Sequence, residues 1–157
     1  LAAAVALVAC DPCDGVVCEN GTCANGTCVC ESGYERMQTS CIAVNKRYVA
    51  KSDSTISGNL LVVDSQGNSS SFSNIGYTFS ADNTKPLEFT LKRFEFISDN
   101  DIILQINPTK FNVLAGGTVT TAAGRSYTYS GGRVGSQVQI EIIDTQMQRT
   151  NTITYQM

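Results

Sequence analysis

The chain has 157 residues, which is enough for one ordinary domain or for a small module followed by a medium domain. Its 11 basic and 14 acidic residues give a formal net charge of −3 and form no basic patch, so we expect no nucleic-acid partner. The absence of His excludes a Ser-His-Asp triad and a His-ligated metal site, and we expect neither a metal nor a cofactor.

Residues 1–9, LAAAVALVA, form an apolar run that ends at Cys10. The run is too short to span a bilayer, which takes about 20 residues, but its composition is that of a signal-peptide hydrophobic region. No initiator Met or basic stretch precedes it, so we interpret residues 1–9 as the remnant of a signal peptide. The alternative is an apolar helical tail that packs on the rest of the protein.

The residues Leu7-Val8-Ala9-Cys10 resemble the lipobox of bacterial lipoproteins. This resemblance implies that the peptide is cut before Cys10 and that the Cys10 thiol is acylated. Residues 10–12 would then be the lipidated amino end, and the membrane would be a partner through this anchor. Asp11 is ambiguous, because an acidic residue there accompanies inner-membrane retention in some Gram-negative groups and surface export in the Bacteroidetes.

Six of the seven cysteines lie within 29 residues, and none follows them. The Gly and Asn residues between them suit tight turns, and almost nothing there could form an apolar core, so the segment needs cross-links to fold. Six cysteines allow 15 pairings, and the spacing alone does not choose among them. Zinc is the alternative, but there is no His, and the only C-x2-C spacing runs from Cys10 to Cys13. The cluster comprises Cys13, Cys18, Cys23, Cys28, Cys30 and Cys41.

The run Cys28-Val29-Cys30-Glu31-Ser32-Gly33-Tyr34, followed after six residues by Cys41, resembles the epidermal growth factor-like signature. The resemblance implies a small two-stranded hairpin within residues 13–41. It also implies that Cys13 pairs with Cys23, Cys18 with Cys28 and Cys30 with Cys41. The flanking residues do not match the calcium-binding versions of the module. Cys10 is left over, in agreement with its acylation.

After a linker at residues 42–45, residues 46–157 are rich in Ser, Thr, Gly, Asn and β-branched residues, in short alternating runs. The alternation predicts an antiparallel sheet folded onto itself, as a meander barrel first and a sandwich second. A shift in the apolar phase predicts a β-bulge at Lys92-Arg93, and Ser98-Asp99-Asn100 reads as a hairpin turn. The predicted strands cover 46–51, 55–63, 72–80, 87–96, 102–106, 117–122, 125–130, 137–142 and 153–157.

The order of these strands and the Gly-rich hairpin at 127–132 resemble the lipocalin-like (calycin-like) barrel domains of Bacteroidetes lipoproteins. The Gly-x-Trp motif of true lipocalins is absent, since the chain has no Trp. Tyr127 and Tyr129 share one face of a strand and are candidates for lining a ligand pocket, with core packing as the alternative. Asp53-Ser54-Thr55 matches a short Bacteroidetes O-glycosylation motif, which makes Ser54 or Thr55 a candidate glycan site.

Six aspartates fall at predicted turns or strand ends, where Asp is normally structural. Asp99-Asn100-Asp101 could offer oxygen ligands to a cation, but we interpret it as a plain turn. No catalytic residue is assigned, and a hydrolase based on paired carboxylates remains only a distant third interpretation. The six are Asp53, Asp64, Asp82, Asp99, Asp101 and Asp144.

The sequence thus predicts a mainly β lipoprotein: an acyl anchor at Cys10, an EGF-like disulfide module and an antiparallel β domain. We expect it to lie in the outer membrane, at the cell surface, with a periplasm-facing position as the alternative. Its expected role is non-catalytic binding of a protein or glycan at the envelope, or structural scaffolding. The second interpretation is a carrier of a small hydrophobic ligand inside the barrel.

Overall fold

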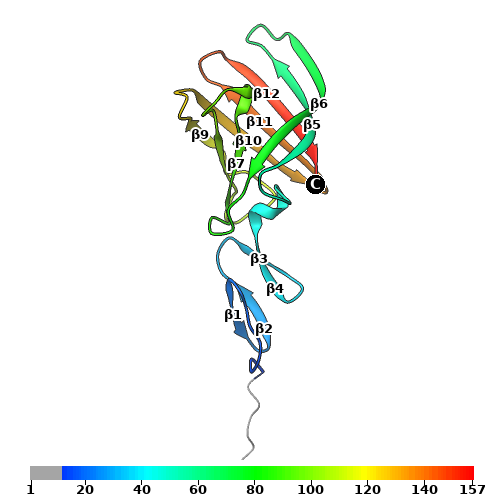
Figure 1. The fold of residues 1–157 in the computed structure, drawn as a ribbon, viewed down its shortest axis with the longest axis vertical. Coiled ribbons are helices and arrows are strands. Elements are labelled where there is room, and N and C mark those ends of the chain that lie inside the picture. Colours follow the sequence, from blue (N-terminus) through cyan, green and yellow to red (C-terminus); the bar gives the residue numbers. More distant parts are fainter. Residues whose placement is uncertain (1–11) are drawn as a thin grey trace, which may run out of the picture. The chain divides into compact units, whose positions relative to one another are not determined.

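The structure is a computed structural model that describes residues 12–157, and it is mainly β (Figure 1). The chain divides into two compact units, of which the first ends at Ile42 and the second covers Ala43–Met157. The predicted signal-peptide remnant, the acylated Cys10 and Asp11 lie outside the described residues.

The first unit is held by disulfides rather than by an apolar core. Strands β1 (Gly21–Ala24) and β2 (Thr27–Cys30) form a hairpin, followed by the pair β3 (Tyr34–Met37) and β4 (Ser40–Ala43). Asn25 and Gly26 join β1 to β2 with φ angles of 51° and 74°, as the two central residues of a tight hairpin turn require. Three disulfides close this unit, each worth about 2–4 kcal/mol in the chain-entropy account.

The second unit is an eight-stranded antiparallel barrel that is nearly closed. Consecutive strands pair with one another except β8 and β9, and the last strand pairs with the first, which makes the predicted meander barrel correct. Between β8 and β9 the wall is completed only by isolated bridges, such as Ile106 to Leu114. The strands are β5 (Ser54–Val63), β6 (Ser69–Ser80), β7 (Glu88–Lys92), β8 (Ile102–Gln105), β9 (Gly117–Thr120), β10 (Ser126–Val134), β11 (Gln137–Asp144) and β12 (Arg149–Gln156).

Alternate residues of the strands point into the barrel and form its core. On β11, Val138, Ile140 and Ile142 are fully buried, whereas Gln137 and Gln139 are exposed. This is the period-2 pattern that predicted the strand. The barrel interior therefore collects the apolar members of each strand.

A short 3-10 helix, η1 (Val44–Arg47), leads into the barrel at the start of this unit. Asn45 is fully buried there, and its side-chain amide donates to the backbone oxygens of Asp82, Lys85 and Glu88 at 2.8, 3.1 and 3.0 Å. Asn45 thus fastens the loop between β6 and β7. The predicted linker at 42–45 is therefore partly core, because Val44 and Asn45 are buried.

Two predicted strand segments are wrong. Residues 46–51 form the end of η1 and turns rather than a strand, because Tyr48 and Val49 both donate their backbone N–H to the Asn45 oxygen. The predicted bulge at Lys92-Arg93 is a strand end: Arg93 has a φ of 47°, and the chain then forms a second 3-10 turn, η2 (Phe94–Phe96). The shift in the apolar alternation correctly indicated an irregularity at this position. The irregularity ends strand β7, however, instead of forming a bulge within it.

Candidate functional site

The centre of the barrel is filled by aromatic side chains. Tyr48 stacks on Phe89 with ring centroids 5.0 Å apart, and Phe79 lies 5.0 Å from Tyr155. The Tyr155 hydroxyl donates to the Tyr48 backbone oxygen at 3.0 Å, and burial raises the pKa of Tyr155. This packing leaves no room along the barrel axis at these rings for a long apolar ligand.

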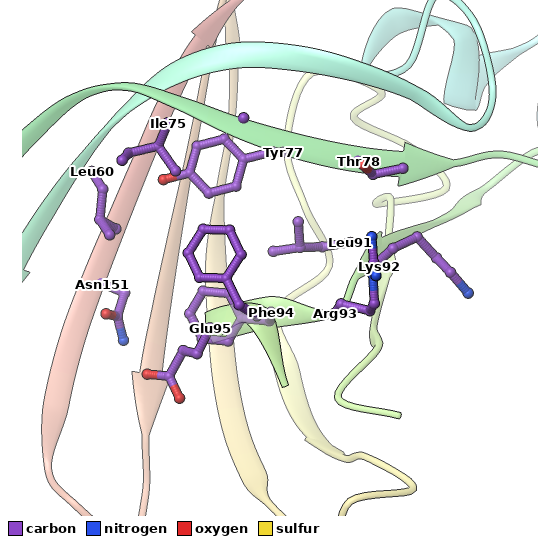
Figure 2. Close-up of a pocket in the computed structure, with 12 residues that line it drawn as sticks. Leu60, Ile75, Tyr77, Thr78, Leu91, Lys92, Arg93, Phe94, Glu95 and Asn151 are labelled. Carbon is purple, nitrogen blue, oxygen red and sulfur yellow. The ribbon is translucent and has the colours of Figure 1, made fainter. Parts of the chain in front are cut away.

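A cavity of about 180 Å³ lies to one side of this core, between β6 and η2 (Figure 2). Leu60 of β5, Ile75 and Tyr77 of β6 and Leu91 of β7 contribute to its walls. Phe94 rises from η2 toward Tyr77 in the same view. The cavity is a candidate binding site because apolar side chains of three strands and η2 converge on it.

The cavity exists because β7 stops early. β6 pairs with β7 only at Thr78–Ser80, so the part of β6 from Ser69 to Tyr77 has no strand on that side. The chain turns inward instead, through Arg93, Glu95 and Phe96, whose φ angles of 47°, 58° and 60° are unusual for residues with a side chain. Because the chain turns inward, Phe94 is buried beside the part of β6 that has no neighbouring strand.

Glu95 holds η2 in this inward position through two arginines. Its carboxylate accepts from Arg125 at 2.6 Å and forms a second ion pair with Arg149. Asp144, which is 2% exposed, lies 3.8 Å from the same Arg125. Two carboxylates therefore share one guanidinium, and the pairing compensates the charge that η2 brings to the barrel end.

A buried amide network supports η2 from the other side. The Asn100 side-chain amide donates to the Phe94 backbone oxygen and to the Tyr127 hydroxyl, each at 2.9 Å. The Thr121 hydroxyl in turn donates to the Asn100 side-chain oxygen at 2.8 Å. Because the Asn100 side chain is fully buried, these bonds replace those that water would supply.

Tyr77 differs from the other buried tyrosines in that its hydroxyl has no hydrogen-bond partner among the described residues. The residue is 7% exposed, and burial raises its pKa to about 12. In Figure 2 the hydroxyl lies on the side of the ring that faces Leu60 and Ile75. The Tyr77 hydroxyl thus lies beside the apolar part of the cavity wall, which also contains polar side chains such as Asn151 and the paired Glu95.

The two predicted pocket tyrosines pack elsewhere. Tyr127 is fully buried, stacks edge-on against Phe94 at 5.4 Å and accepts the Asn100 amide. Tyr129 accepts the backbone N–H of Gln105 at 3.1 Å. Neither ring lines the cavity, so both have the core-packing role that was the alternative.

Five of the six predicted turn aspartates accept hydrogen bonds from nearby groups through their side chains. Asp64 accepts the side-chain amide of Asn68 and the backbone N–H groups of Asn68 and Gln66, and these bonds lower its pKa. Bonds from the Thr84 backbone and hydroxyl lower the pKa of Asp82. Burial raises the pKa of Asp101, but the bonds and positive charges of Lys92 and Arg93 together outweigh it and leave that pKa lowered. Asp144 accepts the backbone N–H groups of the turn that follows it. Asp53 and Asp99 occupy turn positions with a φ of 58°.

Two of these aspartates line the same surface hollow. Asp53 and Asp82 line one open hollow of about 710 Å³, together with Glu88, whose carboxylate is paired with Lys85 at 3.1 Å. Among residues 12–157, no group of three Cys, Asp or Glu side chains is arranged to hold a metal ion. Asn100 points into the core, so the Asp99-Asn100-Asp101 run is a turn whose Asp101 pairs with Lys92.

The cysteines pair as the EGF-like resemblance implied: Cys13 with Cys23, Cys18 with Cys28, and Cys30 with Cys41. In the candidate glycan motif, Thr55 is exposed, whereas the Ser54 hydroxyl donates to the Lys51 backbone oxygen at 2.6 Å. The Thr55 hydroxyl lies 3.4 Å from that of Thr78, so both hydroxyls of the motif have a partner.

The sequence pattern did not identify two residues of the candidate site, Tyr77 and Glu95. Tyr77 lies inside a regular strand, and no sequence signal marks its hydroxyl as unpaired. Glu95 had a signal, since a lone carboxylate between Phe94 and Phe96 would have to leave the core or find cations. Its partners Arg125 and Arg149 are distant in sequence and meet it only in the folded barrel.

None of the helices in the described part of the chain has the length and apolar character needed to cross a bilayer. No family model matches the chain, and no curated protein or solved structure is significantly similar to it.

Proposed function

We propose that the protein is an exported lipoprotein, anchored through an acylated Cys10, that presents a non-catalytic β domain at the cell envelope. The observation that carries this proposal is the set of three disulfides between Cys13 and Cys41. Disulfides persist in oxidising compartments and are rare in the cytosol. They use six of the seven cysteines, so the remaining one is Cys10, at the lipobox-like sequence.

The disulfide unit is best explained as an EGF-like spacer between the anchor and the β domain. Its strands are only four residues long, and Cys28 and Cys41 are among its few buried side chains. A cross-linked module keeps a defined length, whereas a flexible linker would distribute the domain over many positions. This property suits the presentation of a domain away from a membrane.

A binding role is favoured over catalysis by the way the polar groups of the barrel are used. The carboxylate that lines the cavity, Glu95, is paired with Arg125 and Arg149. Asp101 is paired with Lys92, which also lines the cavity. A general acid or base needs a carboxyl group free to exchange a proton with a substrate. Carboxylates held in ion pairs are better suited to stabilising the fold than to transferring protons.

The β5–β6 hairpin offers a surface for a protein or glycan partner. Neither strand contains a charged residue, and residues Ser69–Asn74 of β6 are all exposed. Phe72 and Leu61 expose 48% and 39% of their surfaces on it. Exposed edge strands are usually protected by charges or Pro, so an uncharged one is a reasonable surface for association.

The second candidate, a carrier of a hydrophobic ligand along the barrel axis, has less support. The axis is occupied by Tyr48, Phe79, Phe89 and Tyr155, and the side cavity of about 180 Å³ is small. Sites for drug-sized ligands measure about 300–1,000 Å³.

The anchor can be tested by expressing the precursor in a bacterium that exports lipoproteins and comparing it with a Cys10→Ala variant. We expect the wild-type protein to partition into the detergent phase of Triton X-114 and the variant to remain in the aqueous phase. Protease added to intact cells then separates a surface position, which is sensitive, from a periplasm-facing one, which is protected. Equal partitioning of the two proteins would contradict the proposal.

A further inference from the structure

The cavity between β6 and η2 has the size and walls of a site for a small molecule. Its volume of about 180 Å³ is close to that of an engineered apolar cavity of about 150 Å³ that binds benzene. Leu60, Ile75, Leu91 and Phe94 supply aliphatic and aromatic surface around it. A compact ring or a short branched chain would fill such a space.

The Tyr77 hydroxyl is a polar group of the lining that no other described residue satisfies. Two further polar side chains of the lining have partners: the Asn151 amide donates to the Ile142 backbone oxygen, and Glu95 pairs with two arginines. The Tyr77 hydroxyl is buried and has no hydrogen-bond partner among the described residues, although the tyrosine is 93% covered by the protein. A buried hydroxyl without a partner is destabilising, and proteins normally satisfy such groups. A ligand oxygen in the cavity could supply the missing bond, with the phenol as either donor or acceptor.

The charges around the cavity argue for a neutral ligand. Glu95 is paired with Arg125 and Arg149, and Lys92 is paired with Asp101. Arg93 is exposed at the rim rather than buried in the wall. A charged ligand would lose its hydration inside without meeting an unpaired buried charge of opposite sign.

The cavity also has an entrance that does not require the barrel to open. β6 has no strand neighbour along Ser69–Tyr77 on the side of η2, so the wall is interrupted there. Phe96, which is 82% exposed, also lines the site. A small molecule can therefore enter between β6 and η2.

We propose that this cavity binds a small, uncharged molecule with a compact apolar body and one oxygen that hydrogen-bonds to Tyr77. The inference rests on the proposed function in one respect only, namely that the β domain binds rather than catalyses. It does not depend on the anchor at Cys10, so failure of one proposal leaves the other standing.

The test is an NMR titration of the full ¹⁵N-labelled chain, with its disulfides oxidised, using p-cresol, toluene and p-toluate as probes. We expect saturable shifts with p-cresol below about 10 mM, centred on Leu60, Ile75 and Phe94. Toluene, which lacks the oxygen, should bind about five- to tenfold more weakly, as the loss of one neutral hydrogen bond implies. The anionic p-toluate should bind more weakly still.

Three variants, one of them a control, locate the site. Tyr77→Phe should weaken p-cresol about five- to tenfold and leave toluene unchanged, which removes the preference between them. Tyr129→Phe, the matched loss of a buried hydroxyl outside the cavity, should preserve the preference. Ile75→Phe should fill the cavity and abolish binding of both neutral probes; if it does not fold, the Tyr77→Phe comparison decides alone.

Three results would overturn the inference. These are the absence of saturable shifts with p-cresol, shifts centred elsewhere on the barrel, and an unchanged p-cresol to toluene ratio in Tyr77→Phe. Tighter binding of p-toluate than of p-cresol would refute the neutral ligand class and would indicate that Arg93 recruits an anion.

Discussion

Replacing Tyr77 by Phe should leave the free protein as stable as the wild type or make it more stable. The change removes a buried hydroxyl that has no partner among the described residues and keeps the ring that packs in the wall. An unsatisfied buried polar group costs about 1–3 kcal/mol, so relief of this penalty should offset any loss. We expect the free energy of unfolding to rise by about 0–2 kcal/mol.

Tyr129→Phe is the matched control, because the Tyr129 hydroxyl accepts the Gln105 backbone N–H at 3.1 Å. Its loss leaves that N–H unpaired, so we expect a destabilisation of about 1–3 kcal/mol. The assay is urea unfolding of both variants at neutral pH, followed by far-ultraviolet circular dichroism with the disulfides intact. Equal destabilisation of the two variants would show that the Tyr77 hydroxyl is already bonded and would refute the account of the cavity.

Three further predictions concern the framework. Asn45→Ala should lower the free energy of unfolding, measured in urea, by about 2–3 kcal/mol, because the Asn45 amide bonds the β6–β7 loop. The control Asn59→Ala, at an exposed position, should change it by less than about 0.5 kcal/mol. Dithiothreitol should unfold the disulfide unit but preserve the thermal transition of the cysteine-free β domain, as followed by NMR; loss of both would contradict two independent units. Burial raises the pKa values of Tyr48 and Tyr77 from 10.0 to about 12, so their unfolded forms ionise first, and stability should fall as the pH rises from 10.0 toward 12. Tyr77→Phe should make that decline shallower in urea titrations at graded pH.

The barrel was predictable because its strands carry a period-2 pattern that needs no distant information. Val138, Ile140 and Ile142 alternate with polar residues, and the structure buries all three. The segment 46–51 was mistaken for a strand because its composition resembles one. The Asn45 backbone oxygen accepts the N–H groups of Tyr48 and Val49 and so closes a turn there. The Asn45 side chain fastens this turn to residues about 40 positions away, and such a contact leaves no local signal.

The candidate site was much less predictable than the barrel. Tyr127 and Tyr129 were chosen because they share a strand face, but the bonds to Asn100 and Gln105 assign them to the core. The phase shift near Lys92 correctly located an irregularity. Its form depended on Glu95 meeting arginines from two other hairpins, which only the closed barrel brings together.

The central claim, an exported protein tethered by lipid and cross-linked beside its tether, is tested most directly by the intact mass of the native protein extracted from membranes. We expect a polypeptide that begins at Cys10, carries a diacylglycerol and a further acyl chain, and does not react with iodoacetamide until it is reduced. An unacylated species whose six remaining cysteines alkylate without reduction would contradict the claim.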